Sequence, residues 1–503
     1  MLRFRGHSYF KCSVPEFFKK NFKYIVLTAL VCVPLFSHLG SLPIHLWDES
    51  RLTMNAYELH VNRNFIVIHY NDAPDLWNTK PPFLIWCQAL LMDIVGPNEL
   101  AMRLPSAIAA LLTCIALMVF SIRYLKNFWV GFIAVIILIT APGYVSDHGT
   151  RTGDYDSMLT LFTTISCLYF FAYSETKKNK YLYFFFLSMA FGVLTKSVAA
   201  LFFTPAIFIF VLLRKQFFEI LKNKHFYFGA GIFLLLTLGY YLLREITVPG
   251  YLDAVSMNDL GGRFMTVLEN HRHDAWFYYD NFITKRFSPW YLLLPLGFMA
   301  GVWSTDVRIQ KFSKYLGLLT IVYFLVISSS KTKLEWYDIP LFPLISFLTA
   351  IFLHFIFEII AKMENVNRSL RYNFIPFAFL FIVMLNPYRS TLDKNYLPKP
   401  VPGSWEANFY ELSYYLRDAL RGKHNVKDYE ILKEDFNMQL LLYTKLLKEK
   451  GVNTKFIYVK DIRPNTFVLV QDENLKKCLV SNFEVDTIEA KGNVVKYKIH
   501  DHR

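Results

Sequence analysis

The chain has 503 residues, of which 54% are hydrophobic and 17% aromatic, and only 19% are charged. Soluble domains carry about 25% charged residues, and they do not repeat apolar runs of about 17 to 25 residues, so this composition excludes an ordinary soluble enzyme. The formal net charge of +14 does not indicate nucleic-acid binding, because the basic residues lie mainly in short loops between apolar runs. The sequence predicts a polytopic α-helical membrane protein.

The first apolar run, at residues 24–39, follows a basic N-terminal segment that the positive-inside rule places in the cytoplasm. The first span therefore carries the chain to the external side. The next run, at residues 83–95, is short and contains Asp93, so it predicts an interfacial helix rather than a crossing. Later spans are expected at residues 101–120, 129–144, 158–173, 181–195, 198–213, 226–243, 290–303, 315–329, 339–360 and 373–387.

The loops between these spans alternate in charge, which supports the topology. Basic loops fall on the cytoplasmic side at residues 123–126, 177–180, 214–224, 308–314 and 362–371. The other loops, which carry acids as well as bases, fall on the external side. Residues 1–390 are therefore expected to form a transmembrane domain of about 11 to 13 helices, with a functional site in its external loops.

Residues 391–503 have a different pattern and are expected to lie on the external (periplasmic) side of the membrane. A proline-rich segment at 397–403 opens this region, and residues 405–420 and 434–449 have helical spacing. Strand-like runs follow at residues 455–458, 466–470 and 494–499. The sequence therefore predicts a C-terminal soluble α/β domain.

Acidic residues occur in two of the predicted external loops. Asp48 and Glu49 precede one helical segment, and Asp154 and Asp156 precede another, so capping of the helix that follows is the alternative role for both pairs. Carboxylates that converge from separate loops supply a general base for an acceptor hydroxyl, or hold a cation or an amino sugar. We expect Asp48, Glu49 and Asp156 to be catalytic and Asp154 and Arg151 to bind substrate, with the choice between Asp154 and Asp156 left open.

Basic residues also occur in the predicted external loops, where the positive-inside rule does not explain them. Snorkelling to lipid headgroups is the alternative for any one of them, but together they predict a cradle for a phosphate. Lys80 is the most specific of the set, because Pro81 and Pro82 fix the backbone that follows it. The substrate-binding candidates are Lys80, Lys196, Arg263, His271, Lys331 and Lys333, with Tyr337 as a stacking residue if a cavity lies beside it.

These segments together resemble the GT-C superfamily of membrane glycosyltransferases, in particular the 4-amino-4-deoxy-L-arabinose lipid A transferases and the protein O-mannosyltransferases. The resemblance covers about the first 390 residues, and it is carried by residues 47–51, 80–82, 98–99, 103–106, 156–159, 192–196 and 330–337. It implies a polyprenyl-phosphate sugar donor, inverting transfer at the external face and a catalytic role for Asp48.

Two departures from the family pattern leave the details open. Thr79 replaces the acid that the aminoarabinose enzymes carry before Lys-Pro-Pro, which leaves the sugar and any metal at that position undecided. Lys80 stands where the protein mannosyltransferases favour histidine, which points away from a protein acceptor. No cofactor is predicted with certainty, and a divalent metal remains open.

The resulting hypothesis is a glycosyltransferase that moves a sugar from a polyprenyl phosphate to lipid A, another glycan or a protein. The phosphate would be held by Lys80, Lys196 and one of Lys331 and Lys333, while Asp48 positions or deprotonates an acceptor hydroxyl. The expected partners are this donor, the acceptor and membrane lipids, in a bacterial inner (plasma) membrane with the N-terminus in the cytoplasm.

Two functions from other classes are the alternatives to this hypothesis. A lipid or solute transporter, or flippase, would bury its charges near the middle of the membrane in broken helices. An inactive scaffold would use its C-terminal region to bind partners and would not depend on Asp48.

Overall fold

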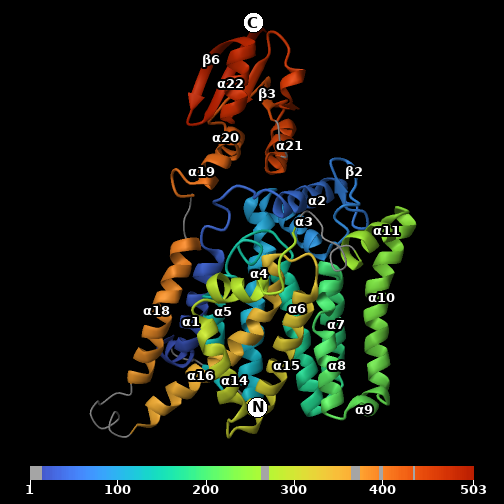
Figure 1. The fold of residues 1–503 in the computed structure, drawn as a ribbon, viewed down its shortest axis with the longest axis vertical. Coiled ribbons are helices and arrows are strands. Elements are labelled where there is room, and N and C mark those ends of the chain that lie inside the picture. Colours follow the sequence, from blue (N-terminus) through green and yellow to red (C-terminus); the bar gives the residue numbers. More distant parts are fainter. Residues whose placement is uncertain (1–13, 262–270, 364–373, 396–399, 434–436) are drawn as a thin grey trace, which may run out of the picture.

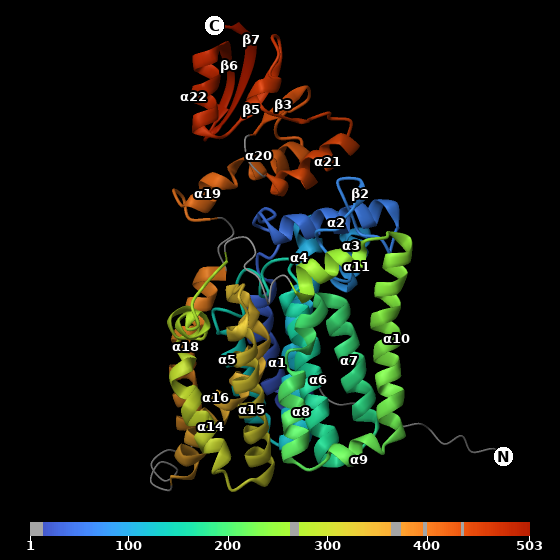
Figure 2. The ribbon, with the colours of Figure 1, turned by 45° about the vertical axis from the view of Figure 1, so that its right-hand side comes forward.

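The computed structural model describes residues 14–261, 271–363, 374–395, 400–433 and 437–503. A bundle of long helices forms the larger part of the molecule, and short helices and loops lie across one end of the bundle (Figure 1). A unit of strands and helices, which ends at the C-terminus, stands beyond that layer in both views (Figures 1 and 2). The functional site lies at the layer between these two parts.

Seven helices in the described part of the chain are long and apolar enough to cross a membrane. They include α4 (Glu99–Phe120), α6 (Asp156–Thr176), α7 (Lys180–Lys196), α10 (Lys224–Thr247), α15 (Val307–Ser329), α16 (Phe342–Lys362) and α18 (Ile375–Asn395). Shorter apolar helical segments complete the bundle: Asn21–Phe36 within α1 (Val14–Phe36), α5 (Phe128–Ile139), α8 (Thr204–Leu213) and α14 (Leu294–Val302). Each predicted span overlaps one of these helices, and the predicted class of polytopic helical membrane protein is confirmed.

Helix α5 shows why the bundle holds together. It is apolar on every side, and its residues from Ile133 to Ile139 are all buried, as expected for a helix surrounded by others. Close helix approach elsewhere depends on small residues. At Gly297 in α14, an added Cβ would lie 2.0 Å from the carbonyl oxygen of Leu348 in α16, so these two helices pack directly through their backbones.

The layer at the end of the bundle is built from α2 (Asp48–Asn62), α3 (Phe83–Val95), α11 (Tyr251–Val255), α13 (Phe277–Asn281) and the β1–β2 hairpin (His69–Tyr70 and Ala73–Pro74). Helix α2 packs against α3 (Figure 2). The predicted helix at 83–95 is therefore present, with the predicted bounds. The π-helix η4 (Phe282–Arg286) and the 3-10 helix η6 (Glu335–Leu341) connect this layer to α14 and α16. The short helix α9 (Phe217–Leu221) lies at the opposite end of the bundle, between α8 and α10.

The C-terminal unit contains a five-stranded sheet with the order β4-β3-β5-β7-β6. β3 (Tyr429–Leu432) is parallel to β4 (Phe456–Ile457) and β5 (Phe467–Val470), whereas β7 (Val494–His502) is antiparallel to β5 and β6 (Phe483–Lys491). Helices accompany it: α19 (Trp405–Phe409), α20 (Glu411–Leu420), α21 (Leu441–Glu449) and α22 (Glu473–Asn482). The predicted α/β character is confirmed, although β3, α22 and β6 were not predicted.

The C-terminal unit contacts the chain just before α2. The Tyr443 hydroxyl accepts a hydrogen bond from the Ile44 N–H (3.1 Å) and donates one to Glu99 at the start of α4 (2.8 Å). Arg417 also pairs with Glu99 (3.3 Å), and the Tyr410 hydroxyl accepts from the Leu46 N–H (3.0 Å). These contacts hold residues 44–46, and so the start of α2, between the two parts of the molecule.

The close contact of α14 with α16 gives a stability prediction. Gly297→Ala should lower the thermal unfolding midpoint of the detergent-solubilised protein, because its Cβ collides with backbone rather than with a movable side chain. Gly239→Ala in α10 is the matched control, since nothing lies within 4 Å of its added Cβ and alanine favours helix by about 0.8–1 kcal/mol. Equal midpoints for the two variants would contradict this packing.

Candidate active site

A pocket lies where the loops of the layer meet the ends of α6, α7 and α15. Its polar part contains Asp48 and Arg51 of α2, and Lys80 before α3. Its lining also includes apolar residues: Leu159 of α6, Val198 and Ala199 of the 3-10 helix η2 (Ser197–Leu201), Phe202, and Val326 and Ile327 of α15. Charged and apolar side chains therefore line one cavity.

A buried ion pair holds the polar part of the pocket in place. Glu49 and Arg103 are each 1% exposed, and Arg103 donates to both oxygens of Glu49 through Nε (2.7 Å) and Nη2 (2.8 Å). Glu49 also accepts from the His45 N–H (2.7 Å) and the Gly153 N–H (2.8 Å). The Glu49 carboxylate thus fixes two backbone segments, the one that leads to Asp48 and the one that leads to Asp154.

The electrostatics of Glu49 agree with a structural role. Burial alone would raise its pKa, but the Arg103 guanidinium and the hydrogen bond from His45 lower the pKa of Glu49 to about 2. Arg103 uses its remaining donors on the carbonyl oxygens of Leu39, Leu42 and Pro43. Both groups are therefore ionised and fully paired.

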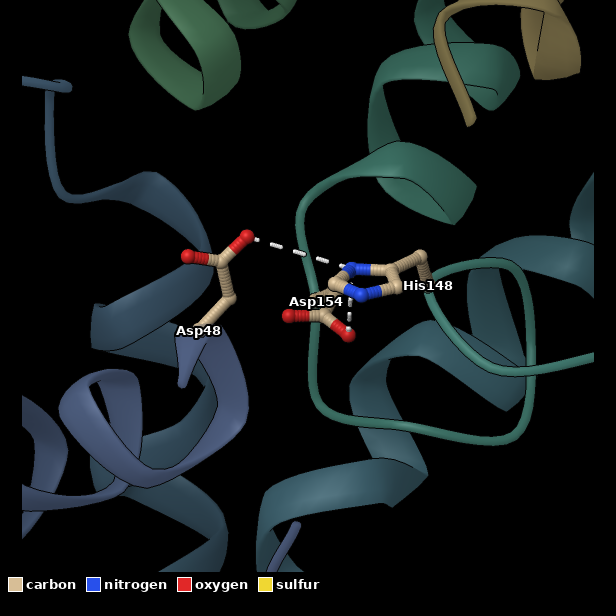
Figure 3. Close-up of side chains that lie close together, drawn as sticks. All are labelled: Asp48, His148 and Asp154. Atoms are coloured by element: carbon tan, nitrogen blue, oxygen red, sulfur yellow. Dashed lines mark ion pairs between the residues drawn. The ribbon is translucent and has the colours of Figure 1, made fainter. Parts of the chain in front are cut away.

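Asp48, His148 and Asp154 lie together at one edge of the pocket (Figure 3). His148 Nδ1 is 3.4 Å from Asp154 Oδ2 and 3.9 Å from Asp48 Oδ2. The ligand atoms of the three residues all lie within 4.8 Å of one another, so this cluster is the group among the described residues that could hold a metal ion.

The surrounding chain fixes the orientation of these side chains. The His148 ring stacks on Trp336 with 3.6 Å between ring centroids and 8° between planes. The Thr152 hydroxyl donates to Asp154 and accepts from the His148 N–H (2.8 Å). Trp47 and His148 have φ angles of 72° and 58°, which residues other than glycine seldom adopt.

Asp154 is the carboxylate with the strongest electrostatic perturbation in this cluster. It is 3% exposed, and burial, together with the charges of Asp48 and Glu49, raises its pKa to about 7 against the opposing effect of His148. Near neutral pH, Asp154 therefore binds a proton far more readily than an ordinary aspartate does.

The segment that carries Lys80 is held by a separate network. Asp75, at the end of β2, pairs with Arg51 through two bonds (2.6 and 2.9 Å) and accepts from the Asn78 N–H (3.0 Å). Although burial opposes ionisation, Arg51 lowers the pKa of Asp75. The Asn78 side chain bonds Tyr155 (2.9 Å), and Lys80 lies over the Tyr155 ring, 5.7 Å from its centroid. Lys80 and Tyr155 both line the pocket.

Lys196 and Asp156 form a second buried ion pair that lines the pocket. Lys196 Nζ lies 2.5 and 2.6 Å from the two oxygens of Asp156. Lys196 also lies 5.6 Å from the centroid of the Tyr337 ring, which lines the same cavity. The three residues come from α6, α7 and η6, so this pair joins the spans to the loop before α16.

The structure thus brings together Asp48, Asp154, Asp156, Lys80, Lys196 and Tyr337 of the predicted site. The other predicted residues in the described part of the chain do not line this pocket. Glu49 is committed to Arg103, and Arg151 donates to the carbonyl oxygens of Pro34, Leu35 and Ser37.

The remaining basic candidates of the described residues are not among those that line the cavity. Lys333 donates to the carbonyl oxygen of Ser330 (2.6 Å), its backbone N–H bonds the carbonyl oxygen of His271 (3.2 Å), and Lys331 is exposed. A phosphate-binding role for Lys331 or Lys333 therefore lacks support from their positions. Arg263 lies outside the described residues.

Sequence reasoning missed several residues of the pocket. His148, Asn78, Asp75 and Asp259 line it or support it, and none was singled out as a site residue. His148 has no motif spacing relative to Asp48 or Asp154, and its partner Trp336 is distant in sequence. The signal in the sequence was its position in the same predicted external loop as Asp154.

Comparisons with known proteins agree with this architecture. Residues 79–241 match the family described as dolichyl-phosphate-mannose-protein mannosyltransferase. The chain is 29% identical over 339 residues to undecaprenyl phosphate-alpha-4-amino-4-deoxy-L-arabinose arabinosyl transferase 2 of Proteus mirabilis. That alignment covers 65% of this chain and 57% of the relative, so this chain spans less than two thirds of the relative's length.

Two solved structures share the fold. ArnT from Cupriavidus metallidurans, bound to undecaprenyl phosphate, has a TM-score of 0.67 at 14% identity, and the match covers 95% of this chain and 98% of ArnT. The archaeal oligosaccharyltransferase AglB from Archaeoglobus fulgidus has a TM-score of 0.51 at 10% identity, with coverages of 96% and 74%. The chain resembles the GT-C membrane glycosyltransferases. At these identities, the structural likeness establishes the fold alone.

The GT-C resemblance predicted from the motifs is therefore confirmed by the family match, by the sequence relatives and by the fold. The prediction of a glycosyltransferase is confirmed with it, and nothing in these similarities supports a transporter. The multi-pass membrane location is also supported, by the apolar helices as well as by these relatives.

The buried Glu49–Arg103 pair gives a prediction about this site. Glu49→Ala should cost about 3–5 kcal/mol of stability, because it leaves the Arg103 charge buried without a partner. The free energy of unfolding in detergent measures the loss. Asp93→Asn is the control, since Asp93 pairs with Arg63 at the surface and exposed pairs contribute little. A Glu49→Ala protein as stable as this control would contradict the anchoring role.

Proposed function

We propose that this protein transfers a glycosyl group from a polyprenyl-phosphate sugar to an acceptor hydroxyl. The reaction would take place in the pocket that Asp48 and Lys80 line. The observation that carries the proposal is the composition of this pocket, whose lining combines carboxylates and lysines with apolar side chains. A lipid-linked sugar phosphate likewise combines a charged, polar part with an apolar chain in one molecule.

The apolar wall suits the prenyl chain of the donor. Phe202, Val326 and Ile327 line the pocket, the last two from the long helix α15, and Leu159 of α6 adds to its apolar lining. The phosphate of a prenyl phosphate would then lie beside the polar lining residues, which include Lys80. A lysine in such a partly desolvated site binds phosphate through a charge-assisted hydrogen bond.

The charge of Lys196 alone would suggest a phosphate contact, but we assign this residue a different role. Its ammonium is already held by both oxygens of Asp156, so the pair carries no net charge. We assign the phosphate contact to Lys80, and we assign to the Lys196–Asp156 pair the role of a polar wall that orients the sugar. Tyr337 lies against this pair, which places an aromatic ring beside the same part of the cavity.

Asp48 is the group that we assign to the acceptor. It begins α2 and its side chain is 62% exposed, so a hydroxyl can reach it. In the transfer step, the acceptor oxygen bonds to the anomeric carbon as the bond from that carbon to the phosphate oxygen breaks. The hydroxyl proton passes to Asp48, and the electron pair leaves on the prenyl phosphate, whose charge Lys80 stabilises.

The orientation in the membrane follows from this assignment together with the charge of the loops. We propose that the pocket and the C-terminal unit, residues 391–503, face the external side, and that the N-terminus is cytoplasmic. The basic loops that the positive-inside rule assigns to the cytoplasm would then lie at the opposite end of the bundle from the pocket. By analogy with the bacterial relatives, the location is the inner membrane, and the acceptor is lipid A, another glycan or a protein.

Removal of the Asp48 carboxylate should abolish transfer. In cells that lack this protein, the polyprenyl-phosphate sugar should accumulate, and wild-type protein should clear it. Asp48→Asn should slow that clearance by about 10²-fold or more, the range of a lost general base. Mass spectrometry of lipid extracts measures the pool. Asp147→Asn is the control, because Asp147 is 57% exposed and does not line the pocket.

Two outcomes of this experiment would count against the proposal. Normal clearance by Asp48→Asn would remove Asp48 from the reaction. An unchanged donor pool in cells without the protein, together with a lipid or solute retained in the cytoplasm, would favour a transporter.

Removal of the Lys80 ammonium should weaken donor binding. Charge-assisted hydrogen bonds contribute about 1.5–3 kcal/mol, so Lys80→Ala should lower affinity for a short-chain polyprenyl phosphate by roughly 10- to 100-fold. Lys331→Ala removes the same charge from an exposed position outside the pocket lining, and it should leave the affinity within about twofold. Calorimetry on purified protein measures both, and equal losses would show that the effect is general electrostatics.

A further inference from the structure

We propose that a second cavity, between the C-terminal unit and the chain just before α2, binds a saccharide part of the acceptor. Saccharide binding stands on the structure of this cavity, whereas its use by the acceptor rests on the function proposed above. The cavity has a volume of about 390 Å³, within the range of about 300–1,000 Å³ found for small-molecule sites. Trp47 lines this cavity and Asp48 lines the candidate active site, so consecutive residues border the two.

The cavity lies where an α/β sheet usually binds a ligand. The parallel strands β3 and β5 are neighbours, but the chain leaves β3 toward β4 and leaves β5, through α22, toward β6 at the opposite edge. Leu432 ends β3, and Gln471 and Asp472 directly follow β5. All three residues line the cavity. Ligands in such sheets bind outside the carboxyl ends of strands whose connections diverge.

The two helices beside these strands leave a crevice at that point. Leu442 of α21 belongs to the same core cluster as Ile431 of β3, whereas Leu475 of α22 packs with Leu432. Successive residues of a strand face opposite sides of a sheet, so α21 and α22 cover opposite faces. Helix α2 lies next to α20 and α21 in both views (Figures 1 and 2), and Leu46 and Trp47, just before it, complete the cavity lining.

A buried polar atom in the cavity lining lacks a partner. Gln439, in the 3-10 helix η7 (Met438–Leu440), is 2% exposed, and its Oε1 has no hydrogen-bond partner among the described residues. Its Nε2 donates to the Asn437 side chain (3.2 Å), which orients the amide. A buried acceptor without a partner is costly, and a hydroxyl group of a ligand would remove that cost.

The charges of the cavity favour a neutral ligand. Lys433 and Asp472 both line it, so the lining carries one charge of each sign. Asp472 Oδ1 accepts from the N–H groups of Asn474 and Leu475 (2.8 and 2.9 Å) at the start of α22. A phosphate, which a helix N-terminus otherwise attracts, would meet this carboxylate. A neutral molecule rich in hydroxyl groups can instead donate to Asp472 and to Gln439.

Aromatic rings indicate that this molecule is a sugar. Trp47 is 64% exposed, and Phe409 of α19 lines the same cavity. The face of an aromatic ring is negative, so it attracts the C–H bonds on one face of a sugar ring while the hydroxyl groups bond the polar side chains. Trp47 has a φ angle of 72°, and residues other than glycine keep such angles mainly at functional sites.

This assignment narrows the acceptor. A saccharide held by Trp47 would lie next to Asp48, the residue that we assign to the acceptor hydroxyl. An acceptor with more than one sugar can place one sugar in the cavity and offer a hydroxyl of another to Asp48, whereas an unmodified protein has no sugar to place there. The acceptor is therefore a saccharide, either a free glycan or the headgroup of a glycolipid.

Saccharide binding by the purified full-length protein in detergent tests the cavity. An array of immobilised bacterial oligosaccharides identifies a saccharide that the wild-type protein binds, and calorimetry with the same saccharide in solution, without any donor, gives its affinity. We expect saturable binding. Trp47→Ala should weaken it by about 10-fold or more, as for other tryptophan anchors. Gln439→Leu should weaken it by about 5-fold, as for a lost hydrogen bond.

Two control variants locate the binding. Trp303→Ala removes a similarly exposed tryptophan (72%) at the end of α14, outside the cavity lining. Lys80→Ala changes the candidate active site without changing the cavity. Both should keep the affinity for the saccharide within about twofold of wild type, because distant sites act independently. Thermal unfolding confirms that each variant is folded.

Three outcomes would overturn the site. The first is the absence of saturable binding of any array saccharide by the wild-type protein, which requires no variant. The second is equal affinity of wild type, Trp47→Ala and Gln439→Leu, because the saccharide then binds elsewhere. The third is a loss in Lys80→Ala as large as that in Trp47→Ala, which would move the binding to the candidate active site.

A further comparison distinguishes the two sources of the saccharide. The intact glycolipid that carries the bound saccharide is compared with the same headgroup after removal of its acyl chains. Affinity that is at least about 10-fold higher for the intact lipid, the gain expected from burial of a few methylene groups, supports the site with a glycolipid acceptor. Equal affinities support the site with a free glycan.

The binding measurement separates this inference from the proposed function. It contains no donor, so a failure to bind saccharides overturns the cavity site and leaves the proposed transfer reaction standing. Conversely, saccharide binding that depends on Trp47 and Gln439, combined with an unchanged donor pool in cells, would support the cavity site and overturn the transfer reaction.

Discussion

The bidentate pair between Glu49 and Arg103 is the interaction on which the site depends. It lies in the interior, and its four carboxylate contacts and five guanidinium contacts tie together the chain before α2, the start of α4 and the loop before α6. Two buried charges cost several kcal/mol each to desolvate, so such a pair survives only when every donor and acceptor is used. That condition is met here, and it fixes the backbone on either side.

The consequence of this pairing is the position of two neighbouring carboxylates. Asp48 precedes Glu49, and Asp154 follows Gly153, whose N–H donates to Glu49 (2.8 Å). One anchored carboxylate therefore sets the separation between the exposed acid and the buried one. Ser106, one turn after Arg103 in α4, donates to the carbonyl oxygen of Asp154 (3.0 Å), which reinforces the same arrangement.

The ionisable groups of the pocket divide into paired and incompletely paired sets. Arg51 with Asp75, and Lys196 with Asp156, satisfy each other and form rigid walls. Asp48 and Asp154, by contrast, face a histidine at the edge of hydrogen-bond distance. Buried groups that lack a full set of partners are costly, and they persist mainly where chemistry or ligand binding needs them. The C-terminal unit contributes indirectly, because Tyr443 and Arg417 hold Glu99 at the start of the helix that carries Arg103.

Much of the fold was predictable from the sequence, since the bilayer imposes a length and polarity that apolar runs display directly. The spans, the helix at 83–95, the α/β character of the C-terminal region and the polar clusters that contain Asp48, Lys80 and Asp156 all follow from such local patterns. Strand β6 and helix α22 were not predicted, because these exposed or short segments lack a clear hydrophobic periodicity.

The roles of individual residues depended on partners far away in the chain. From the sequence, Glu49 is an acid equivalent to Asp48, but in the structure it pairs with Arg103. Similarly, the sequence shows Lys196 as a cation without a partner, whereas the structure pairs it with Asp156. Likewise, His148 gains a role only from Trp336 and two aspartates on other segments. The sequence by itself determined which segments enter the membrane and which charges collect at one end. Only the tertiary structure decided which charges neutralise one another and which remain for a ligand, because burial and pairing are properties of three-dimensional neighbours.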